Sequence, residues 1–508
     1  MGKILIGWAE ESLVPEKKIR LAGQFYERIS EFVESEITAT AMAVECDGEE
    51  MIMVSADLGG IPDFLLRAVR ERFAALTDEV SPSKLIVAAT HTHTSHTMTS
   101  PYEENGANPI GSTKDILAEF MSPDKEYRAT VTADDSVMDT AEATLFVAEK
   151  IANAAHRAWL ARKPALYAND FGRAAVGMCR RVSYDDGTAE MWGDTNTANF
   201  VSMEGGNDSG IELIYTFDES KKLTGVVANI ACPSQILEQR SFVSADYWGR
   251  AKAIIREKLG SHVHLLALGG AGGDQCPRDL VRWVQPETPV LDPHIIRPLP
   301  LKRKADPSMF DISGCNRAGK RVANEIISVY EELGELKDEA TFVHKVLTMD
   351  LPLRKATKSD YEKSVREIEY YVQKNADKPV FTYADNAKMY VYAGNILRYR
   401  RQQYEEIFTI ESHVVRFGNV AFTTNPFELF LDYGNYIKAR SYAEQTFVVQ
   451  LCCGKGGYLP TKKAEAAGHY SAYITSGNVG HEGGDLFVRE TLKQINEMFD
   501  GEDIYDKY

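Results

Sequence analysis

Histidines cluster in one short segment of the chain. His91, His93 and His96 lie within the sequence ATHTHTSH at residues 89–96, directly after an apolar run at 85–88. In an extended chain, residues two apart face the same side, so His91 and His93 can address one point. Neutral imidazole is the commonest metal ligand. The segment is therefore a candidate metal site, although histidines that only hydrogen-bond to the backbone would produce the same pattern.

Further reactive side chains follow predicted strands elsewhere in the chain. Asp274 and Cys276 come after a glycine-rich turn. Backbone amides of such a turn could form an oxyanion hole, and Asp274 could instead cap the turn. Glu428 and Tyr458 lie at two other junctions and offer a carboxylate and a phenol. Loops at strand ends are where α/β enzymes place their chemistry, so these four residues are candidates for a catalytic site.

Three polar residues are candidates for substrate binding. Arg180 and Arg181 are adjacent, and two guanidiniums near a site would suit a carboxylate. A solvated surface pair is the simpler interpretation of these arginines. Gln235 ends the segment NIACPSQ at residues 229–235, which follows a predicted strand.

Composition restricts the classes of partner. The 508 residues include 74 acidic and 57 basic residues, giving a net charge of −17, which argues against nucleic acid or an anionic membrane as the main partner. No apolar run is long enough to span a bilayer. Seven cysteines with a single adjacent pair fit a reducing compartment, which predicts a cytoplasmic protein. We expect a small-molecule substrate and leave homo-oligomerisation open.

Strands and helices mix along the chain without a regular βαβ repeat. Strands are predicted over 38–44, 51–56, 84–89, 210–217, 223–231, 262–268, 411–424 and 445–452. Helices are predicted over 64–76, 141–161, 245–258, 316–333, 359–374, 428–441 and 487–499. This pattern predicts an α/β (α+β) fold with a mixed β-sheet core flanked by helices. Residues 1–508 are expected to form one catalytic-type domain with a surface insertion at 278–310.

Taken together, the junctions resemble the neutral/alkaline (non-lysosomal) ceramidase family. The matching segments occur in the family's order and cover roughly residues 5 to 499. They are SADLGG at 55–60, ATHTH at 89–93, SADYWG at 244–249, GAGGDQCP at 270–277, NPFE at 425–428 and GYLPT at 457–461. Each match is weak alone, but six in order are specific for the fold of that family's catalytic domain.

The resemblance implies a site and a reaction. The family implies a zinc ion held by two histidines, a glutamate and a tyrosine, and hydrolysis of an amide. Carried over to this chain, His91, Glu428 and Tyr458 are the expected metal ligands. His93 and Asp274 would assist catalysis. A tyrosine ligand would require the metal to drive its deprotonation.

The chain departs from the family at the second histidine ligand. The matching segment at 229–235 contains no histidine, and Cys276 replaces a serine of the family's loop. Cys232 or Gln235 could supply the missing ligand. His96, His469 or His481 could also move in, or no metal binds and His91, His93 and Tyr458 act as acid and base.

Three functions remain open from the sequence. The first is a hydrolase that uses a divalent metal, expected to be zinc, to cleave an amide or ester bond of a small polar substrate other than ceramide. The second is a carbohydrate-active enzyme, a uronoside lyase or a glycoside-cleaving enzyme, that uses the same pocket with Arg180 and Arg181 on the acidic sugar. The third is a non-catalytic binding protein that has lost the metal.

Overall fold

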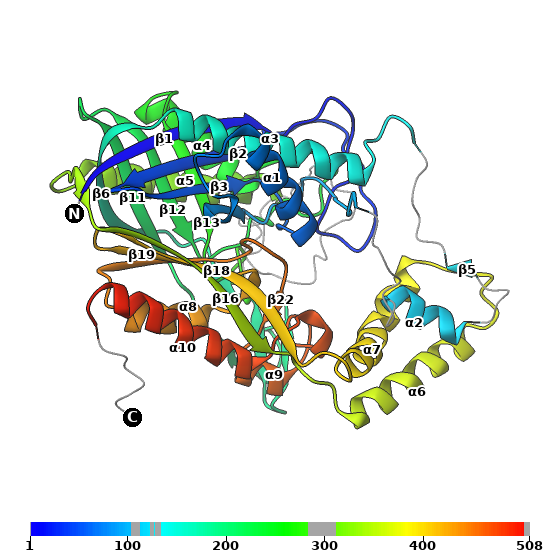
Figure 1. Ribbon diagram of the computed structural model, residues 1–508. Coiled ribbons are helices and arrows are strands. Elements are labelled where there is room, and N and C mark those ends of the chain that lie inside the picture. Colours follow the sequence, from blue (N-terminus) through cyan, green and yellow to red (C-terminus); the bar gives the residue numbers. More distant parts are fainter. Residues whose placement is uncertain (1, 103–111, 122–125, 128–133, 283–310, 502–508) are drawn as a thin grey trace.

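The computed structural model describes residues 2–102, 112–121, 126–127, 134–282 and 311–501 (Figure 1). Most of the predicted insertion, from residue 283 to 310, lies outside these ranges.

The largest sheet consists of β1 (Gly2–Ser12), β2 (Thr38–Cys46), β3 (Glu49–Ala56), β4 (Leu85–Ala89), β6 (Lys163–Arg173), β11 (Gly210–Asp218), β12 (Leu223–Ile230), β13 (His264–Gly269) and β15 (Glu339–Ala340). Eight of these nine strands follow the order β13-β12-β11-β6-β1-β2-β3-β4, and β15 pairs with β1. The pairs β12–β13 and β3–β4 are parallel and the others antiparallel, which confirms the predicted mixed sheet.

A second, four-stranded sheet packs against the first. It consists of β16 (Phe342–Pro352), β18 (Ile407–Phe417), β19 (Val420–Thr424) and β21 (Gln445–Val449), in that order. Phe422 and Phe447 of this sheet share one buried cluster with Ile214 and Val227 of the first sheet. The strands β2 and β3 are almost wholly buried, because both faces of the sheet are covered.

Helices cover the outer faces of both sheets (Figure 1). The first sheet is covered by α1 (Asp63–Leu76), α3 (Thr140–Leu160), α4 (Asp246–Leu259) and α5 (Asp311–Glu331). The second is covered by α8 (Leu431–Arg440) and α10 (His481–Met498). Asp139 shows why α3 begins where it does, because its carboxylate accepts hydrogen bonds from the amides of Ala141 and Glu142. The molecule is thus built in four layers, helix, sheet, sheet and helix.

A small helical unit projects from one side of the sheets (Figure 1). It contains α2 (Thr113–Phe120), β5 (Glu126–Tyr127), α6 (Lys358–Lys374), β17 (Val380–Phe381) and α7 (Tyr383–Arg401). Ile116, Ile368 and Ile396 belong to a buried cluster of its own. Within the described ranges, no helix combines the length and apolar character needed to cross a membrane.

Short elements line the loops between the layers. They are β7 (Met178–Cys179), β8 (Arg181–Tyr184), β9 (Ala189–Met191), β10 (Phe200–Met203), β14 (Gln275–Cys276), β20 (Phe427–Leu429), β22 (Gly457–Leu459), α9 (Lys462–Ala467) and two 3₁₀ turns at Pro82–Lys84 and Ile474–Ser476. Two of them, β20 and β22, pair in parallel and carry residues of the candidate site.

A buried carboxylate joins the strand ends beside the histidine segment. Asp57, directly after β3, accepts hydrogen bonds from the backbone amide of Thr38 at 2.9 Å and from the Thr90 hydroxyl at 3.2 Å. Lys252 of α4 donates to the same carboxylate at 2.9 Å. Asp57 and Lys252 are both buried, and such a pair is stable only when its remaining hydrogen-bonding atoms are also satisfied. This contact fixes where the chain enters the segment 89–96.

Some sequence predictions were wrong at element boundaries. The helix predicted over 428–441 begins at Leu431, and Glu428 lies in strand β20. The helix predicted from residue 487 begins at His481. Its first turn contains Gly483 and Gly484, which are buried, and an added Cβ at these positions would clash with Val479 and Tyr433. These glycines allow close packing and do not mark a turn. Strands β1, β6 and β16 and helix α7 were not predicted.

Candidate functional site

His91 and His93 converge as predicted, but through a different backbone. Strand β4 ends at Ala89, and His91 adopts the left-handed conformation with φ of 67°. This turn brings the two Nε2 atoms to 3.3 Å from each other. The Nδ1 of His91 lies 2.6 Å from the Gly59 carbonyl, and the Nδ1 of His93 lies 3.2 Å from the Glu238 carboxylate.

These outer contacts determine the faces that the rings present. The Gly59 carbonyl only accepts hydrogen bonds, so His91 Nδ1 carries a proton and its Nε2 is the atom that can bind a ligand, and the Glu238 carboxylate beside His93 Nδ1 favours the same tautomer of His93. Burial lowers the pKa of His93, which keeps that ring neutral near pH 7. An outer Nδ1–H held by an oxygen, with Nε2 turned inward, is the usual arrangement of metal-binding histidines.

Glu428 and Tyr458 join the same cluster from the opposite side. They are directly paired across the parallel strands β20 and β22, so the two side chains lie next to each other. Glu428 Oε2 lies 3.5 Å from His91 Nε2. Burial opposes ionisation of Glu428, but the contact with His91 and the charges of His91 and Arg180 keep its pKa below the ordinary value. His91, His93 and Glu428 thus form a chain of contacts centred on His91.

Tyr458 is a protonated phenol in this structure. Burial, followed by the neighbouring carboxylate of Glu428, raises its pKa well above the ordinary value. Its hydroxyl interacts with Glu428 and accepts a hydrogen bond from Arg180 at 3.3 Å. Tyr470 packs edge-on against it, with ring centroids 5.6 Å apart.

Arg180 is next to Tyr458, and Gln235 is bonded to Arg180. The Arg180 guanidinium donates to the Gly273 carbonyl at 2.9 Å and to Gln235 Oε1 at 3.3 Å. Arg180 is 3% exposed, so it is a buried cation of the site and not part of a solvated surface pair. The carboxylate of Glu428 and the phenol of Tyr458 face it.

The structure does not bring Arg181 to this cluster. Its guanidinium is buried against Glu204, with two bonds to that carboxylate, and donates to the carbonyls of Gly468 and Tyr470. These contacts occupy the fork of the guanidinium, which makes Arg181 a structural connection between β8 and the loop after α9.

Asp274 and Cys276 are buried in the segment after the glycine-rich turn. Asp274 Oδ1 accepts the backbone amide of Leu431 at 2.9 Å and therefore holds the first residue of α8. Burial raises the pKa of Asp274 to about 6. Burial likewise raises the pKa of Cys276 to about 12, and its thiol donates to the Arg278 carbonyl at 3.2 Å. Cys276 is therefore a neutral thiol at neutral pH.

The other residues considered as replacement ligands make their contacts elsewhere. His96 Nε2 lies 2.8 Å from the Leu13 carbonyl, and His469 Nδ1 accepts the Met191 amide at 3.0 Å. Cys232 is fully buried, which raises the pKa of its thiol well above the ordinary value.

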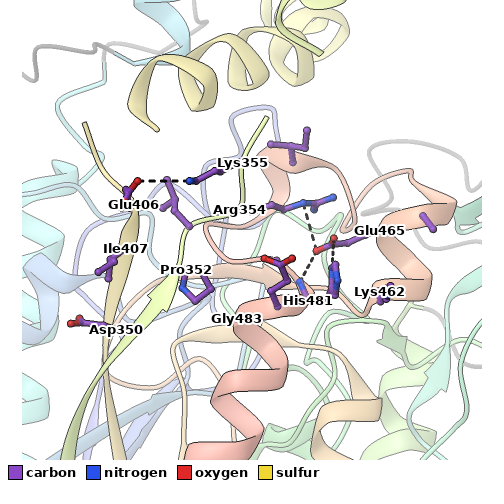
Figure 2. Close-up of a pocket in the computed structure, with 15 residues that line it drawn as sticks. Asp350, Pro352, Arg354, Lys355, Glu406, Ile407, Lys462, Glu465, His481 and Gly483 are labelled. Carbon is purple, nitrogen blue, oxygen red and sulfur yellow. Dashed lines mark hydrogen bonds and ion pairs between the residues drawn. The ribbon is translucent and has the colours of Figure 1, made fainter. Parts of the chain in front are cut away.

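His481 belongs to a different pocket. Figure 2 shows this pocket, of about 930 Å³, with His481 and Arg354 both directed at Glu465. His481 Nδ1 lies 2.8 Å from Glu465 Oε2. The carboxylate that His481 contacts is thus Glu465 and not Glu428.

Sequence reasoning missed three groups that complete the site. Glu238 orients His93, and the Gly59 carbonyl orients His91. Gln450 joins two loops, because its Oε1 accepts the amides of Leu429 and Gly272 at 3.0 and 3.1 Å. The only signal for Glu238 was an acidic residue three positions after Gln235, and a backbone carbonyl leaves no signal in a sequence.

The architecture defines a class: the chain has the fold of the neutral ceramidases. The neutral ceramidase from Pseudomonas aeruginosa superimposes with a TM-score of 0.65 at 15% identity, covering 98% of this chain and 75% of the other. A ceramidase complexed with C2 superimposes with a TM-score of 0.64 at 12% identity, covering 99% of this chain and 76% of the other. No protein-family model and no curated protein matches the sequence. The resemblance stated from the sequence is thus confirmed at the level of the fold.

The buried charge of Asp274 predicts a specific pH dependence of stability. Its pKa of about 6 in the folded state exceeds the ordinary 3.8, so its contribution to stability is full below pH 4 and is lost as pH rises to about 6. Asp274→Asn keeps an oxygen for the Leu431 amide and removes this loss. The free energy of unfolding of the variant, relative to wild type, should rise by about 3 kcal/mol between pH 4 and 6 and stay level above pH 6. Denaturant unfolding at several pH values measures it, and a pH-independent difference would contradict the assignment.

Proposed function

We propose that this protein is a metal-assisted hydrolase that cleaves an amide or ester bond in a small polar substrate. The observation that carries the proposal is the orientation of His91 and His93, whose Nδ1 atoms face Gly59 and Glu238 while their Nε2 atoms face each other at 3.3 Å. Two ring nitrogens and a carboxylate oxygen that all act as acceptors need a proton or a cation between them.

The donor types suit a zinc-class ion, and His91 lies at a suitable separation from His93 and from Glu428. Ligand atoms of a tetrahedral zinc site with nitrogen and oxygen donors lie roughly 3.4 Å apart. The separations of 3.3 Å between the two Nε2 atoms and 3.5 Å between His91 Nε2 and Glu428 Oε2 agree with this edge. Tyr458 is paired with Glu428 and can be the fourth donor when metal binding drives its deprotonation.

We infer that His91, His93, Glu428 and Tyr458 would hold the ion. His93 would then supply the second imidazole that the segment at 229–235 lacks, which is a more direct part than the assisting one expected from the sequence. A divalent ion bound there supplies Lewis acidity, which polarises a carbonyl and lowers the pKa of water.

The protein's own groups position and balance the site. Glu238 and the Gly59 carbonyl fix the two rings, and Asp274 and Gln450 hold the loops beside Glu428. Arg180 places a buried positive charge beside the Tyr458 hydroxyl, which favours the phenolate form of Tyr458. His91 and Glu428 keep 12% and 17% of their side chains exposed, so the cluster is accessible from solvent.

Two features support a polar substrate over a membrane lipid. Arg180 places a guanidinium beside the Tyr458 hydroxyl, and the Gln235 amide is bonded to Arg180. The net charge of −17 opposes approach to an anionic membrane surface. The two solved structures that share the fold are described as ceramidases, but ceramide is not the substrate proposed for this chain.

Replacing His91 by alanine tests the metal-assisted reaction. His91→Ala removes the central donor of the chain of contacts, so metal bound at this cluster and hydrolysis should both fall to background. Elemental analysis should show about one equivalent of metal less than in wild type, and a panel of chromogenic esters and N-acyl amino acids measures hydrolysis. Glu219→Gln, on an exposed turn, is the matched control. Full hydrolysis by wild-type protein after verified removal of metal would contradict the proposal.

Replacing Glu238 by glutamine tests the inferred role of His93. The amide keeps the size of the side chain but removes the charge that holds the His93 Nδ1 proton. Loss of such an orienting carboxylate weakens metal affinity by about 10- to 100-fold. Competition with a chromophoric chelator measures the affinity, with far-UV circular dichroism as the control for folding. Unchanged affinity would remove His93 from the set of ligands.

One observation favours a second candidate, a lyase acting on an acidic sugar. The Arg180 guanidinium lies 3.3 Å from the Tyr458 hydroxyl, so a cation for a carboxylate and a group that can move a proton are adjacent. Cleavage of a uronoside by β-elimination would produce an unsaturated product that absorbs ultraviolet light. A panel of uronosides should give no such absorbance if the hydrolase proposal is right, and a signal that Arg180→Lys abolishes would favour the lyase.

A further inference from the structure

A second group of potential metal ligands lies where the two sheets meet. Glu411, His413 and Cys453 have ligand atoms that all lie within 4.8 Å of one another. Glu411 and His413 are two residues apart on β18 and therefore share one face of the strand. Cys453 follows β21, and its backbone amide donates to the Val87 carbonyl of β4 at 3.0 Å.

His413 of this group and the adjacent His344 have their outer nitrogens held by oxygen atoms. His413 Nε2 lies 2.8 Å from Glu411 Oε1, and His344 Nδ1 lies 3.1 Å from the Glu50 carbonyl. The remaining nitrogens, His413 Nδ1 and His344 Nε2, face each other at 2.9 Å. Because both outer nitrogens face acceptor oxygens, a proton shared between the two inner nitrogens makes one ring an imidazolium, and a bound metal ion would take the place of that proton.

Glu411 itself is already engaged. Arg70 forms two bonds to its carboxylate, at 2.8 and 2.6 Å, in addition to the contact with His413. Arg70 and Glu411 therefore form a neutral pair that orients His413. His344 contacts His413, His413 contacts Cys453, and the Cys453 thiol contacts that of Cys452, so the four remaining side chains form one continuous chain of potential donors.

The two thiols complete the donor set. The Sγ atoms of Cys452 and Cys453 are 3.8 Å apart. Two thiolates bound to one tetrahedral zinc ion, each at about 2.3 Å, are separated by about 3.8 Å. Cys453 interacts directly with His413 and lies in the left-handed region with φ of 51°, as does Leu451 with φ of 52°. Such a conformation costs free energy in a residue with a side chain and persists where the surroundings impose it.

We propose that Cys452, Cys453, His344 and His413 form a buried binding site for a soft, zinc-class metal ion, separate from the cluster around His91. Two thiolates and a divalent ion cancel in charge, so the occupied site would be neutral in the interior. Thiolate and imidazole donors favour zinc over the hard cations magnesium and calcium.

The site would brace the loops that carry Glu428 and Tyr458. The Cys452 amide donates to the Asn425 carbonyl at 2.9 Å, and the Leu451 amide donates to the Phe427 carbonyl at 3.1 Å. The metal would therefore join β16 and β18 to the segment that lies against Glu428. Its proposed role is structural, and it does not depend on the function proposed for the His91 cluster.

Cobalt substitution distinguishes the two metal sites. Protein purified under reducing conditions is stripped of metal and loaded with Co(II), whose bonds to thiolate give an intense near-ultraviolet charge-transfer band. We expect this band in wild type and in His91→Ala, and its loss in Cys453→Ser. Zinc-loaded Cys453→Ser should hold about one equivalent of metal less than wild type. Cys46→Ser, at a buried thiol bonded to the Ala340 carbonyl, is the matched control and should keep the band.

A second measurement needs no variant of the proposed ligands. Titrating zinc-loaded wild-type protein with an organomercurial, which blocks thiols, should release zinc to a chelating dye, and His91→Ala should release the same amount. A cobalt spectrum without the charge-transfer band in folded wild-type protein would overturn the proposal. So would equal metal content in Cys453→Ser and wild type. A mass two hydrogens lower across the Cys452–Cys453 peptide, showing a disulfide, would also overturn it.

Discussion

The buried carboxylate of Asp57 is the contact on which the histidine side of the site depends. Its oxygens accept hydrogen bonds from the Thr38 amide, the Thr90 hydroxyl and the Lys252 ammonium. These bonds connect the ends of β2, β3 and β4 to α4. Removing one partner of such a buried pair leaves an uncompensated charge, which typically costs about 3–5 kcal/mol. Gly59, whose carbonyl orients His91, lies two residues after Asp57. The position of the His91 ring therefore depends on the buried Asp57–Lys252 ion pair and not on the histidine segment alone.

The opposite side of the site is held by hydrogen bonds between loops. Gln450 binds the amides of Leu429 and Gly272 with one oxygen, and Asp274 binds the amide of Leu431. The glycine-rich turn is needed because a Cβ at Gly273 would collide with the Glu428 carbonyl. Its glycines thus serve the close approach of two backbones, whereas from the sequence they were considered for an oxyanion hole. A rigid framework of this kind is what a site needs to hold ligand atoms at fixed separations.

The residue types and their order predicted the fold class and several candidate site residues, but they did not predict the local backbone geometry. The fold class followed from the mix of strands and helices. His91, Glu428 and Tyr458 were candidates from their places at strand ends, and the family resemblance singled them out as expected metal ligands. The sequence could not show that Glu428 lies in a strand, because a short β20 before α8 has the same apolar spacing as the first turn of a helix. It also could not show that His91 turns through a positive φ, or that Glu238 orients His93. Both depend on contacts between segments far apart in the chain. Arg181 could not be told from Arg180, because only the tertiary fold places Glu204 beside one of them.

The parallel pairing of β20 and β22 has a consequence for how the site can diversify. Because Glu428 and Tyr458 are opposite each other in a ladder of only three residue pairs, a shift of one residue in either strand would turn its side chain to the other face. Insertions and deletions near these two strands are therefore constrained, although the helix between them could lengthen at its exposed end. Homologues that accept different molecules are expected to keep this pair of donors, and Glu238, which orients His93, should be kept with them. Evolutionary change in selectivity would then leave the carboxylate and the phenol untouched.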